Sequence, residues 1–143
     1  MGIDSLELVR ERLREAGLRL TAPRRAVVTA LAASERALNL QELLTTARCH
    51  HPSLSLATVY RAIELLQRLG LVRRVHLEGQ RCQRYFLAPS GHWHQLVCLE
   101  CGRVVEFPGG NELERLQQEL EAETGFRIEG HLLQFYGYCP EHL

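Results

Sequence analysis

The chain has 143 residues, which allows one ordinary domain or two small ones. It has no run of about 18 apolar residues that would span a membrane, and its first 15 residues are charged and amphipathic, unlike a secretory signal. We therefore expect a cytoplasmic protein with no membrane partner. In a reducing cytosol, an odd count of 5 cysteines favours metal ligands or buried thiols over disulfides.

The formal net charge is zero, but the two halves of the chain have opposite charges. Residues 1–90 contain 14 arginines against 8 acidic residues, whereas residues 91–143 contain 3 arginines against 9. Lysine is absent, so every fixed cation is a guanidinium, a group that binds phosphate in a planar, bidentate manner. The first half therefore suits a polyanion, although charge alone leaves open a solvated basic surface without a partner.

The first two helices are predicted from hydrophobic periodicity. Residues 3–16 have an amphipathic pattern that ends at Gly17. A second helix is expected to begin at Thr21, because Pro23 is tolerated in the first turn of a helix.

Two further helices are predicted from capping residues. Asn39 and Glu42 have the spacing of a capping box, which opens a short third helix. Ser55 precedes a longer helix at residues 56–69, and Gly70 follows it as the expected C-terminal cap.

From residue 71 the pattern suits strands. Segments 71–76 and 83–87 are predicted to pair through a turn at Glu78–Gly79, and helices followed by a two-stranded wing are typical of a winged helix. Residues 88–91, Ala-Pro-Ser-Gly, are typical of a hinge and lie where the charge changes sign. We predict an α+β fold with an N-terminal winged-helix DNA-binding domain at 1–88, a hinge at 89–91 and a C-terminal α/β domain at 92–143.

The second half of the sequence is predicted to form a small domain that contains both strands and a helix. Segments 92–98 and 104–107 are strand-like around a Cys-Leu-Glu-Cys-Gly turn. A helix is expected at 111–124 and a long strand at 126–138.

Two pairs of metal-ligating residues stand in this second half. Cys98 with Cys101, and Cys139 with His142, are each spaced as a knuckle, and two knuckles supply three thiolates and one imidazole. The set predicts a closed, tetrahedral structural zinc site. A redox pair at Cys98 and Cys101 is the alternative, but such motifs open a helix, whereas Gly102 and a strand follow here. His142 stands next to the C-terminus, where fraying is expected.

His92 and His94 predict a second metal site. Residues two apart on a strand share a face, so the two imidazoles can bind one ion. Glu114 and His131 are further candidate ligands. Their spacing leaves open a glutamate that caps its own helix and a histidine with an ordinary partner.

A third, looser set consists of His76, Cys82 and Glu106. An imidazole, a thiolate and a carboxylate meeting near the hinge would make a zinc-selective sensor, because sulfur favours zinc over manganese. The alternative is a surface histidine and an ordinary wing cysteine.

The helix at 56–69 is the candidate recognition helix. Its first turns are predicted to offer the following DNA contacts: Ser55, Thr58, Tyr60 and Arg61. The hydroxyls suit phosphates and Arg61 suits a base edge, with a solvated helix face as the competing interpretation. The stripe predicted to be buried is Leu56, Val59, Ile63 and Leu66.

Together these segments resemble the ferric uptake regulator family. The resemblance covers nearly the whole chain, through residues 17–24 (GLRLTAPR), 54–61 (LSLATVYR), 96–102 (LVCLECG) after a histidine-rich strand, and 136–139 (YGYC). It implies a homodimer that binds a palindromic operator and represses transcription when a regulatory metal closes the two winged helices. The C-terminal domain would then be the dimerisation domain, and Arg19 joins the predicted DNA contacts.

The resemblance also implies ligand roles. Three cysteines match the family's structural zinc ligands, His142 replaces a fourth, and a regulatory site is matched by His92, His94, Glu114 and His131. Iron and peroxide sensors of the family usually have histidines where Trp93 and Gln95 stand and a carboxylate where Phe86 stands. The closest match is therefore the zinc uptake regulator branch. Its hinge site would also use one histidine of the His92/His94 pair, although one imidazole nitrogen cannot serve both sites.

We therefore predict a zinc-responsive repressor of metal-uptake genes, with structural and regulatory Zn2+, operator DNA as partner and no small-molecule substrate. Within the family, an iron-, manganese- or peroxide-responsive regulator is the alternative. From other classes, the alternatives are a small zinc hydrolase, with Glu114 as base, and a zinc-ribbon adaptor. Neither explains an arginine-rich domain ahead of a hinge.

Overall fold

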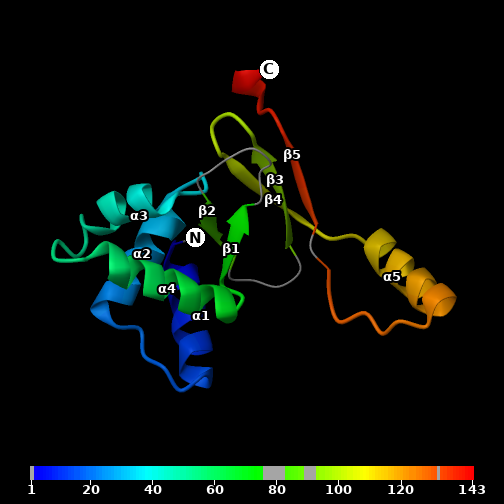
Figure 1. Cartoon of the computed structure of the whole chain (residues 1–143), viewed down its shortest axis with the longest axis horizontal. Helices are drawn as coiled ribbons and strands as arrows, with labels where there is room; N and C mark the ends of the chain where they lie inside the picture. Colours follow the sequence, from blue (N-terminus) through cyan, green and yellow to red (C-terminus); the bar gives the residue numbers. More distant parts are fainter. Residues whose placement is uncertain (1, 76–82, 89–92, 132) are drawn as a thin grey trace.

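The computed structural model describes residues 2–75, 83–88, 93–131 and 133–143, with the backbone alone at 2–4 and 93. Figure 1 shows a bundle of helices beside a small sheet, followed by a second sheet and a last helix that projects away from it. The first sheet has two strands and the second has three. The elements in chain order are α1 (Gly2–Glu15), α2 (Ala22–Ala33), α3 (Leu40–Ala47), α4 (Leu56–Arg68), β1 (Val72–Val75), β2 (Arg84–Leu87), β3 (Trp93–Cys98), β4 (Val104–Pro108), α5 (Asn111–Thr124), β5 (Gln134–Gly137) and a 3-10 turn, η1 (Pro140–His142). This order confirms the predicted α+β fold.

The front helices begin at the predicted capping residues. The Thr21 side chain accepts a hydrogen bond from the backbone N–H of Arg24 at 3.4 Å, and Ser55 accepts one from Thr58 at 3.2 Å. The capping box of α3 is complete, because Asn39 Oδ1 accepts from the Glu42 N–H at 2.8 Å while Glu42 Oε1 accepts from the Asn39 N–H at 3.1 Å. These local bonds satisfy amide donors that have no partner inside a helix.

The front core forms where the apolar stripes of α1 to α4 meet β1 and β2. Leu13, Leu43 and Ile63 are almost completely buried there. Leu56 was predicted to be in this core, but 45% of it is exposed. At about 100° per residue, Leu56 lies roughly 60° around α4 from Val59, off the centre of the buried stripe.

The wing is the antiparallel pair β1 and β2, in which Val72 pairs with Leu87 and Val75 with Arg84. The predicted turn at Glu78–Gly79 lies outside the described residues. No helix in the described part of the chain is long and apolar enough to cross a membrane.

The second sheet has the order β4-β3-β5, with β3 antiparallel to β4 and parallel to β5. The predicted strand over 126–138 is wrong in extent, because among its described residues only Gln134–Gly137 form a strand, and residues 126–131 have no regular structure. β5 pairs with β3 over residues 95–98 and with no other described strand. A segment with no neighbouring strand has no partner for its backbone N–H and C=O groups, so it cannot form the hydrogen-bond ladder of a sheet.

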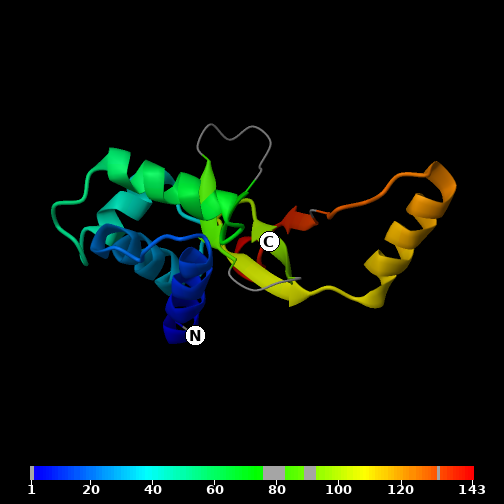
Figure 2. The ribbon, with the colours of Figure 1, turned by 90° about the horizontal axis from the view of Figure 1, so that it is seen from below.

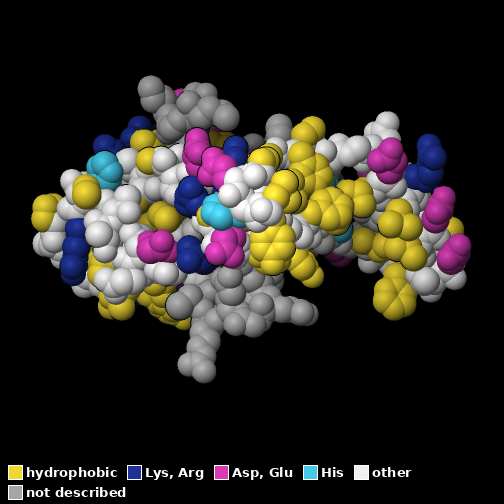
Figure 3. Space-filling model, turned by 90° about the horizontal axis from the view of Figure 1, so that it is seen from above, with side chains coloured by type: hydrophobic (Ala, Val, Ile, Leu, Met, Phe, Trp, Pro, Cys, Tyr) yellow, Lys and Arg dark blue, Asp and Glu magenta, His cyan; other side chains and the backbone are white. Residues whose placement is uncertain are grey.

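Helix α5 stands apart from the sheet in both ribbon views (Figures 1 and 2). None of its described residues is buried, and 49% of Leu116 is exposed. On the sheet, Leu96, Val105 and Phe135 are cross-strand neighbours on one face and are also exposed. Figure 3 shows hydrophobic side chains gathered over this part of the molecule and over α5. We call the three sheet residues and the α5 leucines the open apolar face.

Candidate metal centre and recognition helix

Three cysteines and one histidine converge at one end of the second sheet. This end of the sheet leads to the C-terminus (Figure 1). Their ligand atoms all lie within 4.8 Å of one another: those of Cys98, Cys101, Cys139 and His142. The Cys101 and Cys139 Sγ atoms are 3.9 Å apart, and Cys139 Sγ lies 3.0 Å from His142 Nδ1. It is the one such group among the described residues that could hold an ion.

The local fold explains why the four residues meet. Gly102 has φ +74°, a conformation that favours glycine, and its N–H donates to the Cys98 carbonyl at 2.9 Å, which closes the first knuckle. Because β5 runs parallel to β3, with Gly137 opposite Cys98, the next turn of chain places Cys139 beside that knuckle. The Cys139 N–H then donates to Cys98 Sγ at 3.4 Å.

The thiols of the cluster ionise unequally. Burial opposes ionisation of Cys98, but N–H groups of Cys101, Cys139 and Glu100 and the Cys101 thiol outweigh it and lower the Cys98 pKa to about 6. Burial raises the pKa of Cys139, and the neighbouring thiols raise it further. A bound cation would offset the repulsion between the thiolates with its own positive charge and so favour their deprotonation.

The donor set and its spacing fit zinc. Thiolates at about 2.3 Å from a tetrahedral zinc ion lie about 3.8 Å apart, close to the 3.9 Å between Cys101 and Cys139. The redox interpretation of Cys98 and Cys101 has no helix to support it, because a turn and then β4 follow the pair. Cys49, by contrast, is exposed on the front domain, far along the chain from the cluster.

The second predicted set is only partly together. His94 is buried on β3, and its ring centroid lies 5.1 Å from that of His131 and 5.6 Å from that of Phe107. Glu114 is exposed in the first turn of α5 and forms no group with these two histidines close enough to share an ion. The helix begins after Gly110, so the capping role for Glu114 with Asn111 is also absent. His92 lies outside the described residues.

The third predicted set cannot be placed as a whole. His76 and Cys82 lie outside the described residues. Glu106 lies on β4, where partial burial raises its pKa and the charge of Arg73 on β1 partly offsets this effect. Of the three candidates, only Glu106 lies among the described residues.

The candidate recognition helix presents its first turns to solvent. Half of Tyr60 is exposed, and Arg61 is exposed with one guanidinium nitrogen 3.3 Å from Thr58 Oγ1. The hydroxyls of Ser55 and Thr58 are 2.9 Å apart at the N-terminus of α4. Arg19 is exposed in the segment before α2, and its carbonyl accepts a hydrogen bond from Arg24 at 2.7 Å.

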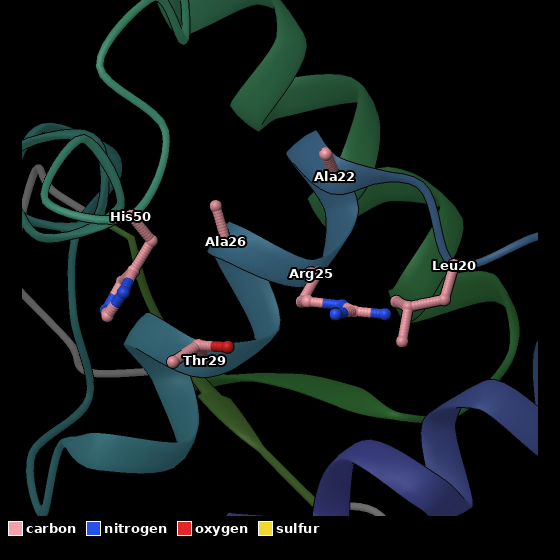
Figure 4. A pocket seen from close by; sticks show the side chains of 6 residues that line it. All are labelled: Leu20, Ala22, Arg25, Ala26, Thr29 and His50. Atoms are coloured by element: carbon pink, nitrogen blue, oxygen red, sulfur yellow. The ribbon is translucent and has the colours of Figure 1, made fainter.

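A separate hollow of about 370 Å³ lies on the front domain (Figure 4). Its wall comes from the segment before α2, from α2 itself and from the turn after α3: Leu20, Ala22, Arg25, Ala26, Thr29 and His50. It contains none of the predicted site residues, and His50 belongs to no ion-sized group of ligands among the described residues.

Sequence reasoning missed one set of contacts with the metal cluster. The segment between α2 and α3 reaches the first knuckle, where Arg36 Nη1 donates to the Cys101 carbonyl at 3.1 Å and the Ala37 N–H donates to the Gly102 carbonyl at 2.9 Å. About 65 residues separate these partners along the chain. Backbone pairing over such a distance leaves no local pattern in the sequence.

The chain is similar to known proteins over most of its length. The sequence model of the Ferric uptake regulator family matches residues 15–136. The peroxide operon regulator of Bacillus subtilis (strain 168) is 32% identical over 143 residues, which cover 99% of this chain and 95% of the relative.

Two solved structures are similar over nearly their whole length. The ferric uptake regulator Fur of Helicobacter pylori, described with three functional metal-binding sites, is 25% identical with a TM-score of 0.69, covering 99% of this chain and 93% of the other. A zinc uptake regulator complexed with zinc and DNA is 25% identical with a TM-score of 0.74, covering 99% and 94%. Members of the family are transcription regulators and not enzymes, which removes the hydrolase alternative. This chain therefore belongs to the ferric uptake regulator family and is a metal-responsive transcriptional regulator.

Proposed function

We propose that the protein is a zinc-responsive repressor that binds palindromic operator DNA as a homodimer and controls metal-uptake genes. The observation that carries the choice of zinc is the burial of Phe86 in an apolar cluster with Val75 and Val97. Family resemblance predicts a carboxylate ligand at this position in iron and peroxide sensors. Gln95, at another such position, is also buried and is not a histidine.

Two kinds of zinc site belong to the proposal. Cys98, Cys101, Cys139 and His142 would hold a structural ion in a closed shell, and the 4.8 Å cluster supports this role. A regulatory ion would use His94 and His131, whose rings are adjacent, together with His92. Glu114, the fourth predicted ligand, would join them only if α5 approached β3, because the two rings and this carboxylate form no ion-sized group here. A hinge site at His76, Cys82 and Glu106 is the further candidate, and the charge of Arg73 on the wing acts on Glu106.

DNA binding is assigned to α4 and its arginine-rich surroundings. Tyr60 and Arg61 are exposed on the first turns, while the opposite face of the helix is anchored by Val59 and Ile63 in the core. A helix held in this way can enter a major groove with its polar face. Arg19 and the hydroxyls of Ser55 and Thr58 would bind phosphates.

The homodimer is assigned to the open apolar face. Exposed leucines on α5 and exposed side chains on the sheet have no cover within the described chain. A second copy would bury both surfaces and present two copies of α4 to one duplex. Regulatory zinc would bind the closed dimer more tightly than the open one and so shift the population towards the form that binds DNA.

The test is DNA affinity as a function of metal. A duplex is first enriched from a random library with the zinc-loaded protein, and its affinity is then measured by fluorescence anisotropy for chelator-treated, zinc-, manganese- and iron(II)-loaded protein. We expect zinc to give the tightest binding at the lowest free-metal concentration, with a steep salt dependence. Equal affinity of chelated and loaded samples would overturn the proposal. Preference for iron(II) or manganese, or release by peroxide, would assign the protein to another branch.

A matched pair of variants tests the role of α4. Arg61→Ala should weaken affinity for the enriched duplex by about tenfold, because one base contact contributes about 1–3 kcal/mol. Arg68→Ala removes the same charge from the last turn of the helix and should change affinity much less. Equal losses of affinity in the two variants would mean that Arg61 contributes only its positive charge and contacts no base.

A further inference from the structure

The segment Glu35–Leu38, between α2 and α3, pairs with the wing along one edge. The Leu38 N–H donates to the Tyr85 carbonyl at 2.8 Å, and the Tyr85 N–H donates to the Leu38 carbonyl at 2.8 Å. This reciprocal pair is the unit of an antiparallel ladder. The segment therefore extends the β1-β2 sheet by one short strand, which we call the linking strand.

The other edge of the linking strand pairs with the cysteine knuckle. The Ala37 N–H donates to the Gly102 carbonyl at 2.9 Å, and the Val104 N–H donates to the Glu35 carbonyl at 3.0 Å. Arg36 lies opposite Arg103 in this bridge. Successive residues of a strand direct their backbone groups to opposite edges, so one strand can bind the wing and the knuckle at once.

Side chains reinforce both edges. Arg36 Nη1 donates to the Cys101 carbonyl at 3.1 Å. Arg84, on the wing, donates to the Ala37 carbonyl at 3.2 Å and forms an ion pair with Glu42 at 3.0 Å. Glu42 is also the capping-box residue of α3, so the contacts run from the knuckle through the linking strand to a helix of the DNA-binding domain.

An apolar cluster covers the same junction. Ala37 of the linking strand, Val75 and Phe86 of the wing and Val97 of β3 are all buried there, with Val104 packed against them. The wing and the second sheet therefore share a small core. The linking strand therefore contributes Ala37 to a core that also contains residues of the wing and of β3.

We propose that the linking strand couples the metal in the Cys98–Cys101 knuckle to the DNA-binding domain, with Arg36 as its positioning residue. The acceptors for Arg36 and Ala37 are the carbonyls of the ligand Cys101 and of Gly102, the residue that follows it and closes the knuckle turn. An ion held by both cysteines fixes that turn, and with it one edge of the linking strand. Loss of the ion releases the edge and loosens the docked winged helix. The inference rests on the metal assigned to this cluster under the proposed function.

Hydrogen exchange of the full-length protein tests the coupling without DNA. Zinc-loaded and chelator-treated samples are compared amide by amide. Chelation should accelerate exchange at Ala37 and Val104 by at least tenfold, and at Leu38, which bonds only the wing, by a smaller factor. The Ile63 amide in the core of α4 is the control and should not change. Acceleration confined to Cys98 and Gly102, with Ala37 and Leu38 unchanged, would overturn the inference.

Coupling is reciprocal, so the front domain must also affect zinc binding. Arg36→Ala should raise the zinc dissociation constant, measured by competition with a chromophoric chelator, by about fivefold, the effect of one hydrogen bond. Arg36→Lys, which keeps a donor, should restore most of the affinity. Arg103→Ala removes the same charge from the opposite position of the bridge and should stay within about twofold of the parent.

Equal zinc affinity in Arg36→Ala and Arg103→Ala would overturn the role of Arg36. Neither readout depends on an operator, so the two proposals fail separately. A protein that binds no DNA but shows the exchange and zinc effects would overturn the proposed function alone. A protein that binds DNA with zinc but shows neither effect would overturn the coupling alone.

Discussion

In the front domain, four helices and a hairpin enclose a core in which Leu13 and Leu43 are fully buried, whereas no described residue of α5 in the second half is buried. The second half has instead a narrow three-stranded sheet, a cluster of metal-ligating side chains and the open apolar face. Small domains bury too little apolar surface to be stable without a metal, a disulfide or a partner. The front half is therefore expected to fold on its own core, and the second half to depend on its ligands and on a second copy.

This difference in core burial also indicates different roles for the two halves. A front domain with a complete core can keep α4 rigid whether or not metal is present. A second half that depends on metal and on a partner changes its stability with both, as a regulator requires. The linking strand lies where a metal-dependent part meets a metal-independent one.

Removal of one cluster ligand should have the largest effect. Cys139→Ser is expected to lose about one equivalent of zinc per chain and, because structural zinc sites contribute on the order of 10 kcal/mol, to unfold β3 and β5. The front core should stay folded. Zinc content by mass spectrometry and hydrogen exchange in the same sample measure both effects.

Cys49→Ser is the control for this substitution, because Cys49 is an exposed thiol of the front domain. It should keep its zinc and its exchange pattern. If Cys139→Ser retains zinc, or if α1 to α4 unfold together with the sheet, the contrast between the halves is wrong.

A truncation in the front core should have the next largest effect. Leu13 is fully buried between the helices, so Leu13→Ala should lower the free energy of unfolding of the front domain by about 2–5 kcal/mol. Leu56→Ala, at an exposed leucine of the same domain, should lower it by at most about 0.5 kcal/mol. Urea unfolding followed by circular dichroism measures the free energy of unfolding of both variants. Equal losses would mean that Leu56 contributes to the core as much as Leu13 does.

Features set by neighbouring residues were predicted well. The caps at Thr21, Asn39 and Ser55 depend on a side chain and an amide a few residues away, so the printed sequence contains both partners. The spacing within each knuckle is equally local, and it predicted that the four side chains would meet, as they do. The sequence did not show that the segment between α2 and α3 also contacts the first knuckle.

Features set by distant partners were missed or wrong. The pattern that predicted a strand over 126–138 indicates that a segment can pair. The neighbouring β3 determines that the pairing covers only Gln134–Gly137 among the described residues. Leu56 has helical spacing with Val59, but burial depends on which helices lie beside it. The pairing of Ala37 with Gly102 uses backbone groups, which every residue has, so no residue type indicates it.

The smallest effect is expected at the open apolar face, where it concerns association and not folding. Leu116 is 49% exposed on α5, and in a symmetric dimer each copy contributes the same side chain. Leu116→Ala should raise the dimer dissociation constant by about tenfold, with little change in the unfolding of the front domain. Gln118→Ala, two residues along on the far side of the helix, should leave the constant within about twofold. Analytical ultracentrifugation of zinc-loaded samples measures both dissociation constants. Equal values in the two variants would mean that the α5 leucines lie outside the contact between the two copies. The sheet residues Leu96, Val105 and Phe135 would then be the surface that a second copy must cover.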